Sequence, residues 1–307
     1  MAYKTQLFHL YFKQWITIYK QGAVSKVTLD KYLINCEHLK KIAPQLKLYN
    51  LNRQSYQQVL NEYAQTHEKR TTLDFHHQLR SSLQDAFDDQ IIKRDPTRKA
   101  IIKGTVSRKR KKKFLHKEEL KQLLKQLNID GNLTLDYLIL LLAKTGLRFS
   151  EAIALIPKDF DFNLNQISIT KTWSYKNIHA DFASTKNKSS ERTIVIDKIL
   201  ARSFKVVLEQ NKLETPIFLK PGKRIHNDTS NDHLEKLCKQ ANIPSISLHG
   251  LRHTHASILL YSGVSVGSVA RRLGHANITT TQKTYLHIIR ELEVQDNEKV
   301  LKAMQNF

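Results

Sequence analysis

Six consecutive basic side chains stand about a third of the way along the chain, at residues 108–113. So dense a run of like charge cannot be packed, and it stays extended or mobile unless it meets a counter-charge. It therefore divides the 307 residues into two parts that each need a core of their own, and a chain of this length suffices for about two domains. The run consists of Arg108, Lys109, Arg110, Lys111, Lys112 and Lys113.

The basic run belongs to a strongly basic protein, because 50 Lys and Arg face 28 Asp and Glu, giving a net charge of +22. Such a surface repels itself unless it meets a polyanion, so nucleic acid is the expected partner. A ribosomal or membrane-surface protein shares such an excess, whereas solubility alone does not require it. The run itself is either a solvated linker or a strap along a phosphate backbone, and we favour the strap.

Cysteine content and hydropathy exclude several other classes. The two cysteines, Cys36 and Cys238, allow neither a disulfide framework nor a cysteine-rich zinc site, and they fit a reducing cytoplasm. The apolar stretch "TLDYLILLLAKTG" is shorter than the roughly 20 residues of a membrane span and predicts a buried helix. The start, "MAYKTQLFHL", lacks the pattern of a signal peptide.

Residues 1–102 predict an all-helical domain, followed by a basic linker at 103–114. Apolar residues recur there with the period of a helix, and a start signal at Ser25 and a stop near Pro44 bound the second helix. The four stripes are Leu7, Tyr11, Trp15 and Ile18; Leu29, Tyr32, Leu33, Cys36 and Leu39; Tyr56, Val59, Leu60 and Tyr63; and Leu73, Leu79, Leu83 and Phe87.

Residues 115–307 predict a mostly helical α+β domain. Helical stripes return at its start, but apolar and polar residues alternate between about 160 and 197, with Ile167 and Ile169 on one face and a return run at 193–196. This alternation predicts a small antiparallel sheet with a long hairpin. Further helices are expected at about 199–213, 230–240, 250–262, 266–273 and 278–290, with a charged one reaching residue 307.

Familiar nucleotide, protease and metal motifs are missing from the sequence. It contains no glycine-rich phosphate loop, no HExxH and no nucleophile elbow. The pair His249 and His253 has the i,i+4 spacing of helical metal ligands, but a third ligand and a nearby general-base glutamate are missing. We therefore expect no metal. His253 and His255 are assigned to packing or to the surface, although His253 is also placed to support His249.

What remains is a set of cationic and proton-transferring groups beside sharp turns. Arg148 begins a helix whose capping signal is "SEA", and His249 and Arg252 lie on one helix face because they are three residues apart. His275 and Tyr285 follow in "LGHANITTTQKTYLH", with Tyr285 expected on a helix. Two guanidinium groups suit a phosphodiester, since each offers paired donors to its non-bridging oxygens and keeps its charge.

Three motifs, "KTGLRFSEAIAL", "LHGLRHTHAS" and "LGHANITTTQKTYLH", resemble those of the tyrosine recombinases, the phage integrase family. The resemblance covers the whole second part of the chain, and it implies that this part is the catalytic domain. It also implies that the first part is a four-helix, SAM-like core-binding domain. The basic linker stands where the family's linker crosses DNA.

The resemblance implies a role for each matching residue. Tyr285 would attack one DNA strand and form a covalent 3′-phosphotyrosine. Arg148 and Arg252 would clamp the scissile phosphate and stabilise charge in the transition state. His249 would accept or donate a proton, and His275 would hydrogen-bond the phosphate. Because positive charge surrounds the tyrosine, we expect its proton to be lost more easily than that of a free tyrosine.

A lysine on the hairpin is implied as the general acid that protonates the leaving 5′-oxygen. In "FASTKNKSSERTIVI" the best match is Lys186, and Lys188 is the rival. Glu151 matches an acidic position that orients the site. Since the phosphotyrosine preserves the energy of the phosphodiester, the resemblance implies that no cofactor, neither ATP nor a metal, is needed.

The resemblance further implies double-stranded DNA sites as partners, a homotetramer on two sites, and an excision or directionality factor, in a cytoplasmic, nucleoid-associated protein. The segment after Leu292 is expected either to dock on a neighbouring subunit or to pack on its own domain. We favour the integrase of a mobile element, from the spacing "TTTQKTYLHI" and the lysine-rich composition, although we find no room for an arm-binding domain before residue 1. Alternatives are an Xer-type or plasmid resolvase, an invertase, a type IB topoisomerase and an inactive DNA-binding regulator.

Overall fold

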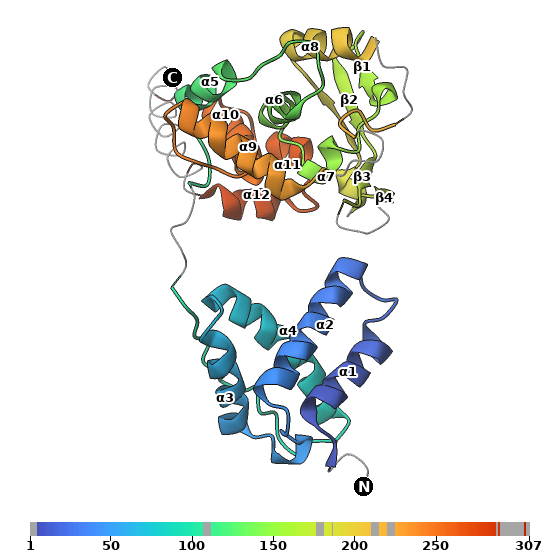
Figure 1. The fold of residues 1–307 in the computed structure, drawn as a ribbon, viewed down its shortest axis with the longest axis vertical. Helices are drawn as coiled ribbons and strands as arrows, with labels where there is room; N and C mark the ends of the chain where they lie inside the picture. The colour runs from blue at the N-terminus through green and yellow to red at the C-terminus, as the bar shows by residue number, and fades with distance from the viewer. Residues whose placement is uncertain are drawn as a thin grey trace. The chain divides into compact units, whose positions relative to one another are not determined.

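The structure is a computed structural model that describes residues 5–106, 112–175, 181–185, 187–209, 215–219, 225–286, 288 and 304. The chain forms two compact units, Met1–Arg110 and Lys111–Phe307 (Figure 1). The division falls within the basic run, of which residues 108–111 lie outside the described residues.

The first unit is built from helices around an aromatic core. The side chains of Ser25 and Asn52 cap the starts of α2 and α3. Trp15 Nε1 donates a hydrogen bond to Asp85 Oδ2 (2.6 Å), which joins the first helix to the last. The elements are α1 (Phe8–Tyr19), α2 (Lys26–Ile42), the 3₁₀ turn η2 (Leu48–Asn50), α3 (Arg53–Ala64) and α4 (Lys69–Asp88).

Three residues of the predicted apolar stripes are exposed instead of buried: Ile18 (61%), Leu33 (40%) and Phe87 (43%). On α1, Phe8 and Phe12 are fully buried, so the buried face is rotated from the predicted one. The reason is that α1 is apolar on more than one face, so that periodicity alone does not decide which face meets the core.

The second unit is mostly helical with small antiparallel sheets, as predicted. One sheet has the strand order β1-β2-β5, with Ile167 paired to Ile194, and the other pairs β3 with β4. The strands are β1 (Phe160–Asp161), β2 (Gln166–Ile169), β3 (Lys171–Trp173), β4 (Phe182–Ser184) and β5 (Arg192–Val195), with 3₁₀ turns η3 (Pro157–Asp159) and η4 (Lys188–Ser190). The helices are α5 (Lys117–Lys125), α6 (Leu135–Thr145), α7 (Phe149–Ala152), α8 (Lys198–Glu209), α9 (Asn227–Gln240), α10 (Leu248–Tyr261), α11 (Val266–Leu273) and α12 (Ile278–Thr284).

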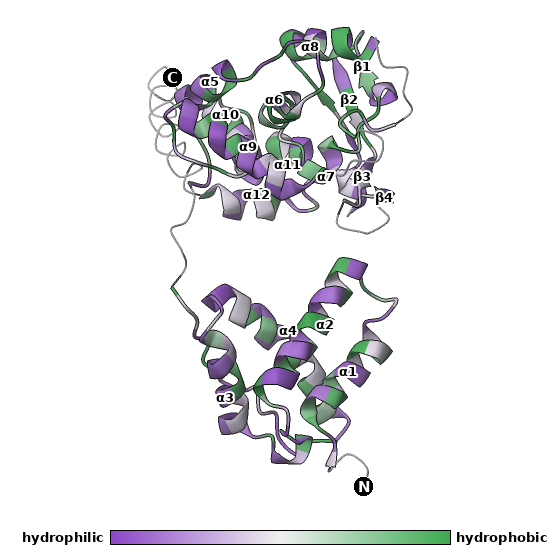
Figure 2. Cartoon of the chain, in the orientation of Figure 1, coloured by the Kyte–Doolittle hydropathy of each residue, from purple (hydrophilic) through white to green (hydrophobic). Residues whose placement is uncertain are grey.

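Helix α6 lies at the centre of this unit, and its surface is largely hydrophobic (Figure 2). Leu138, Ile139 and Leu141 are fully buried on it, and α10 packs closely against it. Burial on all sides explains why the apolar run is continuous rather than amphipathic. Within the described residues, no helix combines the length and hydropathy needed to cross a membrane.

Helix α12 ends earlier than the predicted 278–290. It runs from Ile278 to Thr284, and Tyr285 follows as its C-cap with φ −112°. Of residues 287–307 only 288 and 304 are described, so the predicted docking segment lies outside the described residues.

Candidate functional site

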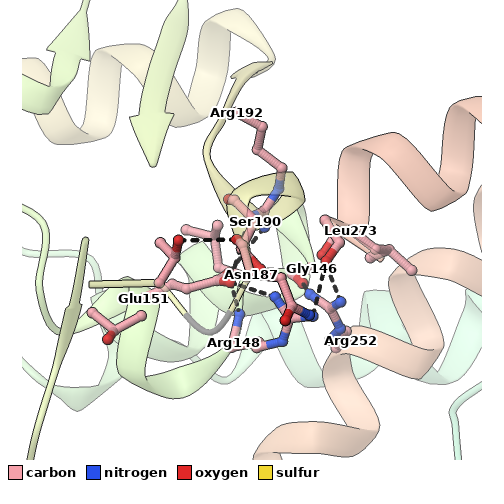
Figure 3. A network of polar contacts seen from close by, with 12 residues as sticks. Gly146, Arg148, Glu151, Asn187, Ser190, Arg192, Arg252 and Leu273 are labelled. Carbon is pink, nitrogen blue, oxygen red and sulfur yellow. Dashed lines mark hydrogen bonds and ion pairs between the residues drawn. The ribbon is translucent and has the colours of Figure 1, made fainter. Parts of the chain in front are cut away.

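The C-terminal end of α11 holds three arginines. The carbonyl oxygens of positions 272, 273 and 274 each accept a hydrogen bond from a different guanidinium: Arg192 Nε (2.6 Å), Arg252 Nη2 (2.6 Å) and Arg148 Nη2 (3.0 Å). The last carbonyls of a helix have no partner inside the helix and form the negative end of its dipole, so they favour cations. Side chains from α7, α10 and β5 therefore meet at one helix end (Figure 3).

Gly274 makes this convergence possible. It ends α11 in the left-handed conformation, with φ +66°, which glycine adopts without strain. A Cβ atom at this position would lie 2.9 Å from Arg192 Nη1 and 3.1 Å from Ser190 Cα, too close for ordinary contact. Any other residue would therefore strain the helix end and displace an arginine.

Glu151 joins two of these arginines. Its Oε1 accepts from Arg148 Nη1 (2.6 Å) and Arg192 Nη1 (3.4 Å), and its Oε2 from the Arg148 backbone N–H (3.0 Å) and Arg192 Nη2 (2.9 Å). Although burial raises the pKa of the carboxyl, the hydrogen bond and charge of Arg192, with those of Arg148, bring it below the usual value. Glu151, 1% exposed, is thus a buried carboxylate with its acceptor sites filled.

Arg252 is buried with only 3% of its surface exposed. Its Nη1 donates to the carbonyl of Gly146 (2.8 Å), which ends α6 with φ +69°. Burial, followed by repulsion from Arg148, lowers the pKa of the guanidinium to about 9, which leaves it charged at neutral pH. The residue is therefore a buried cation anchored on the ends of two helices.

These residues form the arginine cluster: Arg148, Arg192, Arg252 and Arg272, with Glu151. The cluster holds four guanidinium groups and one carboxylate, which pairs with Arg148 and Arg192, and the remaining positive charge favours a bound anion. Arg148 has 32% of its side chain exposed, so part of this charge faces solvent.

Tyr285 is buried within reach of the charge of Arg252, with 2% of its surface exposed. Its hydroxyl is 2.9 Å from His253 Nδ1. Burial raises the pKa of the phenol to about 12, although the charge of Arg252 acts in the opposite direction. The expectation that positive charge lowers this pKa was therefore wrong in net direction, because desolvation exceeds the attraction of the arginine.

Three histidines complete the histidine–tyrosine cluster, which we define as His249, His253, His275 and Tyr285. The His249 and His253 rings meet edge to face at 4.7 Å, and His275 Nδ1 lies 2.7 Å from Thr281 Oγ1. Burial first, with repulsion from neighbouring positive charge, lowers the pKa of all three, to about 4 for His253 and His275. All three are thus neutral at neutral pH.

Two histidines have contacts that the sequence did not reveal. His253, assigned to packing or surface, contacts the Tyr285 hydroxyl. His255 is buried: its Nε2 accepts from Arg272 Nε (2.9 Å), so its Nδ1 carries the proton and donates to the Ala143 carbonyl (3.2 Å). Burial, with the charge of Arg272, lowers its pKa to about 3.

Arg192 was not identified as a site residue from the sequence, because nothing in "ERTIVI" distinguishes it from an ordinary strand residue. Among the other predicted residues, Lys186 lies outside the described residues, and Lys188 is exposed on the η4 turn. Lys113 is exposed, whereas Lys112 Nζ pairs with Glu119 Oε1 at 2.8 Å. Within the described ranges, no group of three or more His, Cys, Asp or Glu is arranged to hold a metal ion.

Known proteins share this architecture. The integrase of Staphylococcus phage L54a is 29% identical over 177 residues, 53% of this chain and 50% of that protein. The ICEBs1 integrase of Bacillus subtilis (strain 168) is 28% identical over 223 residues, 68% of this chain and 60% of that protein. The chain thus spans between half and three fifths of the length of these relatives.

Among solved structures, the Tn1549 transposon integrase in complex with a circular intermediate DNA has a TM-score of 0.76. It is 19% identical, and the match covers 90% of this chain and 94% of that one, which establishes a common fold. The model of the phage integrase family matches residues 113–291, more than half of the chain. The chain therefore belongs to the phage integrase family, the tyrosine recombinases.

Proposed function

We propose that the protein is a site-specific DNA recombinase that breaks and rejoins DNA strands through a covalent 3′-phosphotyrosine at Tyr285. The observation that carries this proposal is the pair of guanidinium groups, Arg148 and Arg252, anchored on adjacent carbonyls with an excess of positive charge around them. A phosphodiester is a monoanion with two non-bridging oxygens, and two fixed guanidinium groups match both its charge and its shape.

In the proposed reaction the Tyr285 oxygen attacks phosphorus, the bond to the 5′-oxygen breaks, and the hairpin lysine supplies a proton to that oxygen. Arg148 and Arg252 stabilise the charge that develops on the non-bridging oxygens. His275 hydrogen-bonds the phosphate, and His249 accepts or donates a proton. Reversal by another strand's 5′-hydroxyl rejoins the DNA and needs no external energy source.

The surroundings of Tyr285 have to change before its oxygen attacks. Its hydroxyl, with a pKa of about 12, faces His253, with a pKa of about 4. Burial disfavours the charged form of both groups, so moving the proton from the tyrosine to His253 is unfavourable in this arrangement. We therefore infer that His253 holds the tyrosine in a resting, protonated state, and that bound DNA changes the arrangement.

A site-specific recombinase of this kind implies several partners. Double-stranded DNA with specific sites is the substrate, engaged by the first unit and by the basic linker as well as by the catalytic unit. A homotetramer on two sites and an excision factor complete the proposed assembly. The integrases of phage L54a and of ICEBs1 support the proposed role in a mobile element, and the alternative is an Xer-type resolvase.

The test is incubation with a library of nicked suicide duplexes, in which the cleaved strand loses the fragment needed for religation. We expect covalent adducts only with duplexes that share one related target sequence. In these adducts the protein should be attached to the 3′ phosphate of the cleaved strand. Relaxation of any supercoiled plasmid regardless of sequence would indicate a topoisomerase instead, and binding without any adduct would indicate a regulator.

The role of the hairpin lysine is tested by comparing ordinary suicide duplexes with duplexes that carry a better leaving group. Lys186→Ala should slow cleavage of ordinary DNA about 10²–10⁴-fold, the usual contribution of a general acid, and should spare a duplex whose 5′ leaving group needs no proton. Equal losses on both duplexes would assign the role to Lys188 or another acid, and Lys188→Ala is the matched comparison.

A further inference from the structure

We propose that Arg192 is a positioning residue of the phosphate clamp: by sharing Glu151 with Arg148 and binding the end of α11, it keeps Arg148 oriented and prevents Glu151 from neutralising its charge fully. The proposal rests on the function proposed above. It concerns a residue outside the six positions that resemblance implies for the chemistry, and it assigns Arg192 no contact with DNA.

The contacts of Arg192 distinguish it from Arg148, the exposed arginine of the clamp. Its side chain is 8% exposed, against 32% for Arg148. Its Nε, Nη1 and Nη2 donate to the carbonyls of Arg272 (2.6 Å) and Ser190 (2.7 Å) and to both oxygens of Glu151 (Figure 3). A guanidinium with these internal partners serves the scaffold rather than the substrate.

Arg192 and Arg272 form a reciprocal connection between β5 and α11. Arg192, on β5, donates to the carbonyl of Arg272 at the end of α11. Arg272 in turn donates from Nη1 to the carbonyl of Val195 on β5 (2.9 Å). These two bonds fix the position of the helix end whose next two carbonyls hold Arg252 and Arg148, so they set the spacing between the clamp arginines.

The sharing of Glu151 has an electrostatic consequence. With Arg192 present, one carboxylate is divided between two guanidinium groups, and one positive charge of the trio remains without a counter-charge. Without Arg192, the buried carboxylate has Arg148 as its remaining partner, and the two form a neutral pair. Arg148 would then attract a phosphate less strongly and lie closer to Glu151.

The experiment measures single-turnover cleavage of a suicide duplex by the full chain. One duplex carries the ordinary scissile phosphodiester, and a second carries a neutral methylphosphonate, which needs little charge stabilisation. For Arg192→Gln we expect cleavage of the ordinary duplex to fall about 10- to 100-fold, the value of one or two hydrogen bonds to charged groups. The loss on the methylphosphonate should be much smaller, and DNA affinity should stay unchanged.

Two further variants and a control make the result decisive. Arg192→Lys keeps the charge but not the planar fork, and should lose activity in the same substrate-dependent way even if the glutamine variant is unstable. Adding Glu151→Gln to Arg192→Gln removes the carboxylate that neutralises Arg148, so part of the lost rate should return. Arg202→Gln, at an exposed site on α8, should cleave both duplexes as the unaltered protein does.

Wild-type rates in both Arg192 variants, or equal losses on the two duplexes, would overturn the positioning role. Additive losses in the Glu151 double variant would overturn the sharing of the carboxylate. If the unaltered protein forms no adduct on any duplex while Arg202→Gln behaves identically, the proposed function fails, and the inference fails with it. If the unaltered protein cleaves and the Arg192 variants cleave equally well, the inference alone fails.

Discussion

The arginine cluster and the histidine–tyrosine cluster both include buried residues of α10, yet burial has opposite consequences in them. Arg252 stays charged because carbonyls of two helix ends accept hydrogen bonds from its guanidinium, and Glu151 stays ionised because two arginines pair with it. His253 stays neutral because burial and neighbouring cations both disfavour its charged form, and Tyr285 stays neutral because burial outweighs the attraction of Arg252.

The difference indicates that the two clusters would serve different steps of the reaction. The site that would hold the phosphate is charged and oriented before DNA arrives, so the protein need not reorganise to stabilise the transition state. The proposed nucleophile, Tyr285, is in contrast buried, protonated and hydrogen-bonded to a weak base. DNA cleavage would then depend on substrate binding to release Tyr285, and the resting protein would not attack adventitious phosphates.

The largest effect is expected from the nucleophile itself. Tyr285→Phe removes the attacking oxygen but keeps the buried ring, which packs with Ala256 and Leu273. Covalent adduct should be lost completely on a suicide duplex, as read on a denaturing gel, while DNA binding in a mobility-shift assay is retained. An adduct formed by this variant would remove Tyr285 from the mechanism.

A large effect is also expected in the arginine cluster. Arg252→Lys keeps a positive charge but cannot reach the carbonyls of Gly146 and Leu273 together, as the planar fork does. Loss of one oriented donor to a developing anion costs about 10²–10³-fold in rate, and single-turnover cleavage measures it. A loss below about tenfold would mean that charge alone, without orientation, accounts for the cluster.

A smaller effect concerns stability at acid pH. His255 has a folded-state pKa of about 3, below its usual value of 6.5, so the unfolded chain binds more protons between these values. Stability is therefore complete above about pH 6.5 and is lost as the pH falls toward 3, by about 2 kcal/mol for this group between pH 7 and pH 5. Denaturant unfolding at the two pH values measures the loss.

His255→Leu isolates this contribution, because it removes the titrating group without adding another. The variant should be less stable at pH 7, since Arg272 loses an acceptor, but its stability should change less between pH 7 and pH 5 than that of the unaltered protein. An unchanged difference would show that His255 does not stay neutral in the folded state.

The smallest effect is expected for His253→Gln, which keeps a hydrogen-bonding side chain beside the Tyr285 hydroxyl. Because burial lowers the pKa of His253 to about 4 and raises that of Tyr285 to about 12, His253 is a weak base toward the phenol in the resting arrangement. Cleavage should therefore fall less than about tenfold, whereas loss of a general base costs about 10²–10⁴-fold. A hundredfold loss would give His253 a catalytic role after DNA binding.

The sequence predicted the parts of this arrangement that depend on local pattern. The boundaries of α11 agree with the predicted 266–273, and Arg148 begins a helix as its capping signal indicated. The contact between His253 and Tyr285 joins residues 32 positions apart, and that between Arg192 and Glu151 joins residues 41 apart. Such contacts depend on how α10, α11 and β5 pack, which periodicity does not encode.

The proposed recombination requires Tyr285 to become covalently attached to the 3′ end of a cleaved strand. After adduct formation on a suicide duplex, protease and nuclease digestion leaves a peptide that still carries a short nucleotide, and its mass spectrum locates the attachment. We expect the added mass on Tyr285, linked through the 3′ phosphate. Attachment to another residue, or through a 5′ phosphate, would contradict the account.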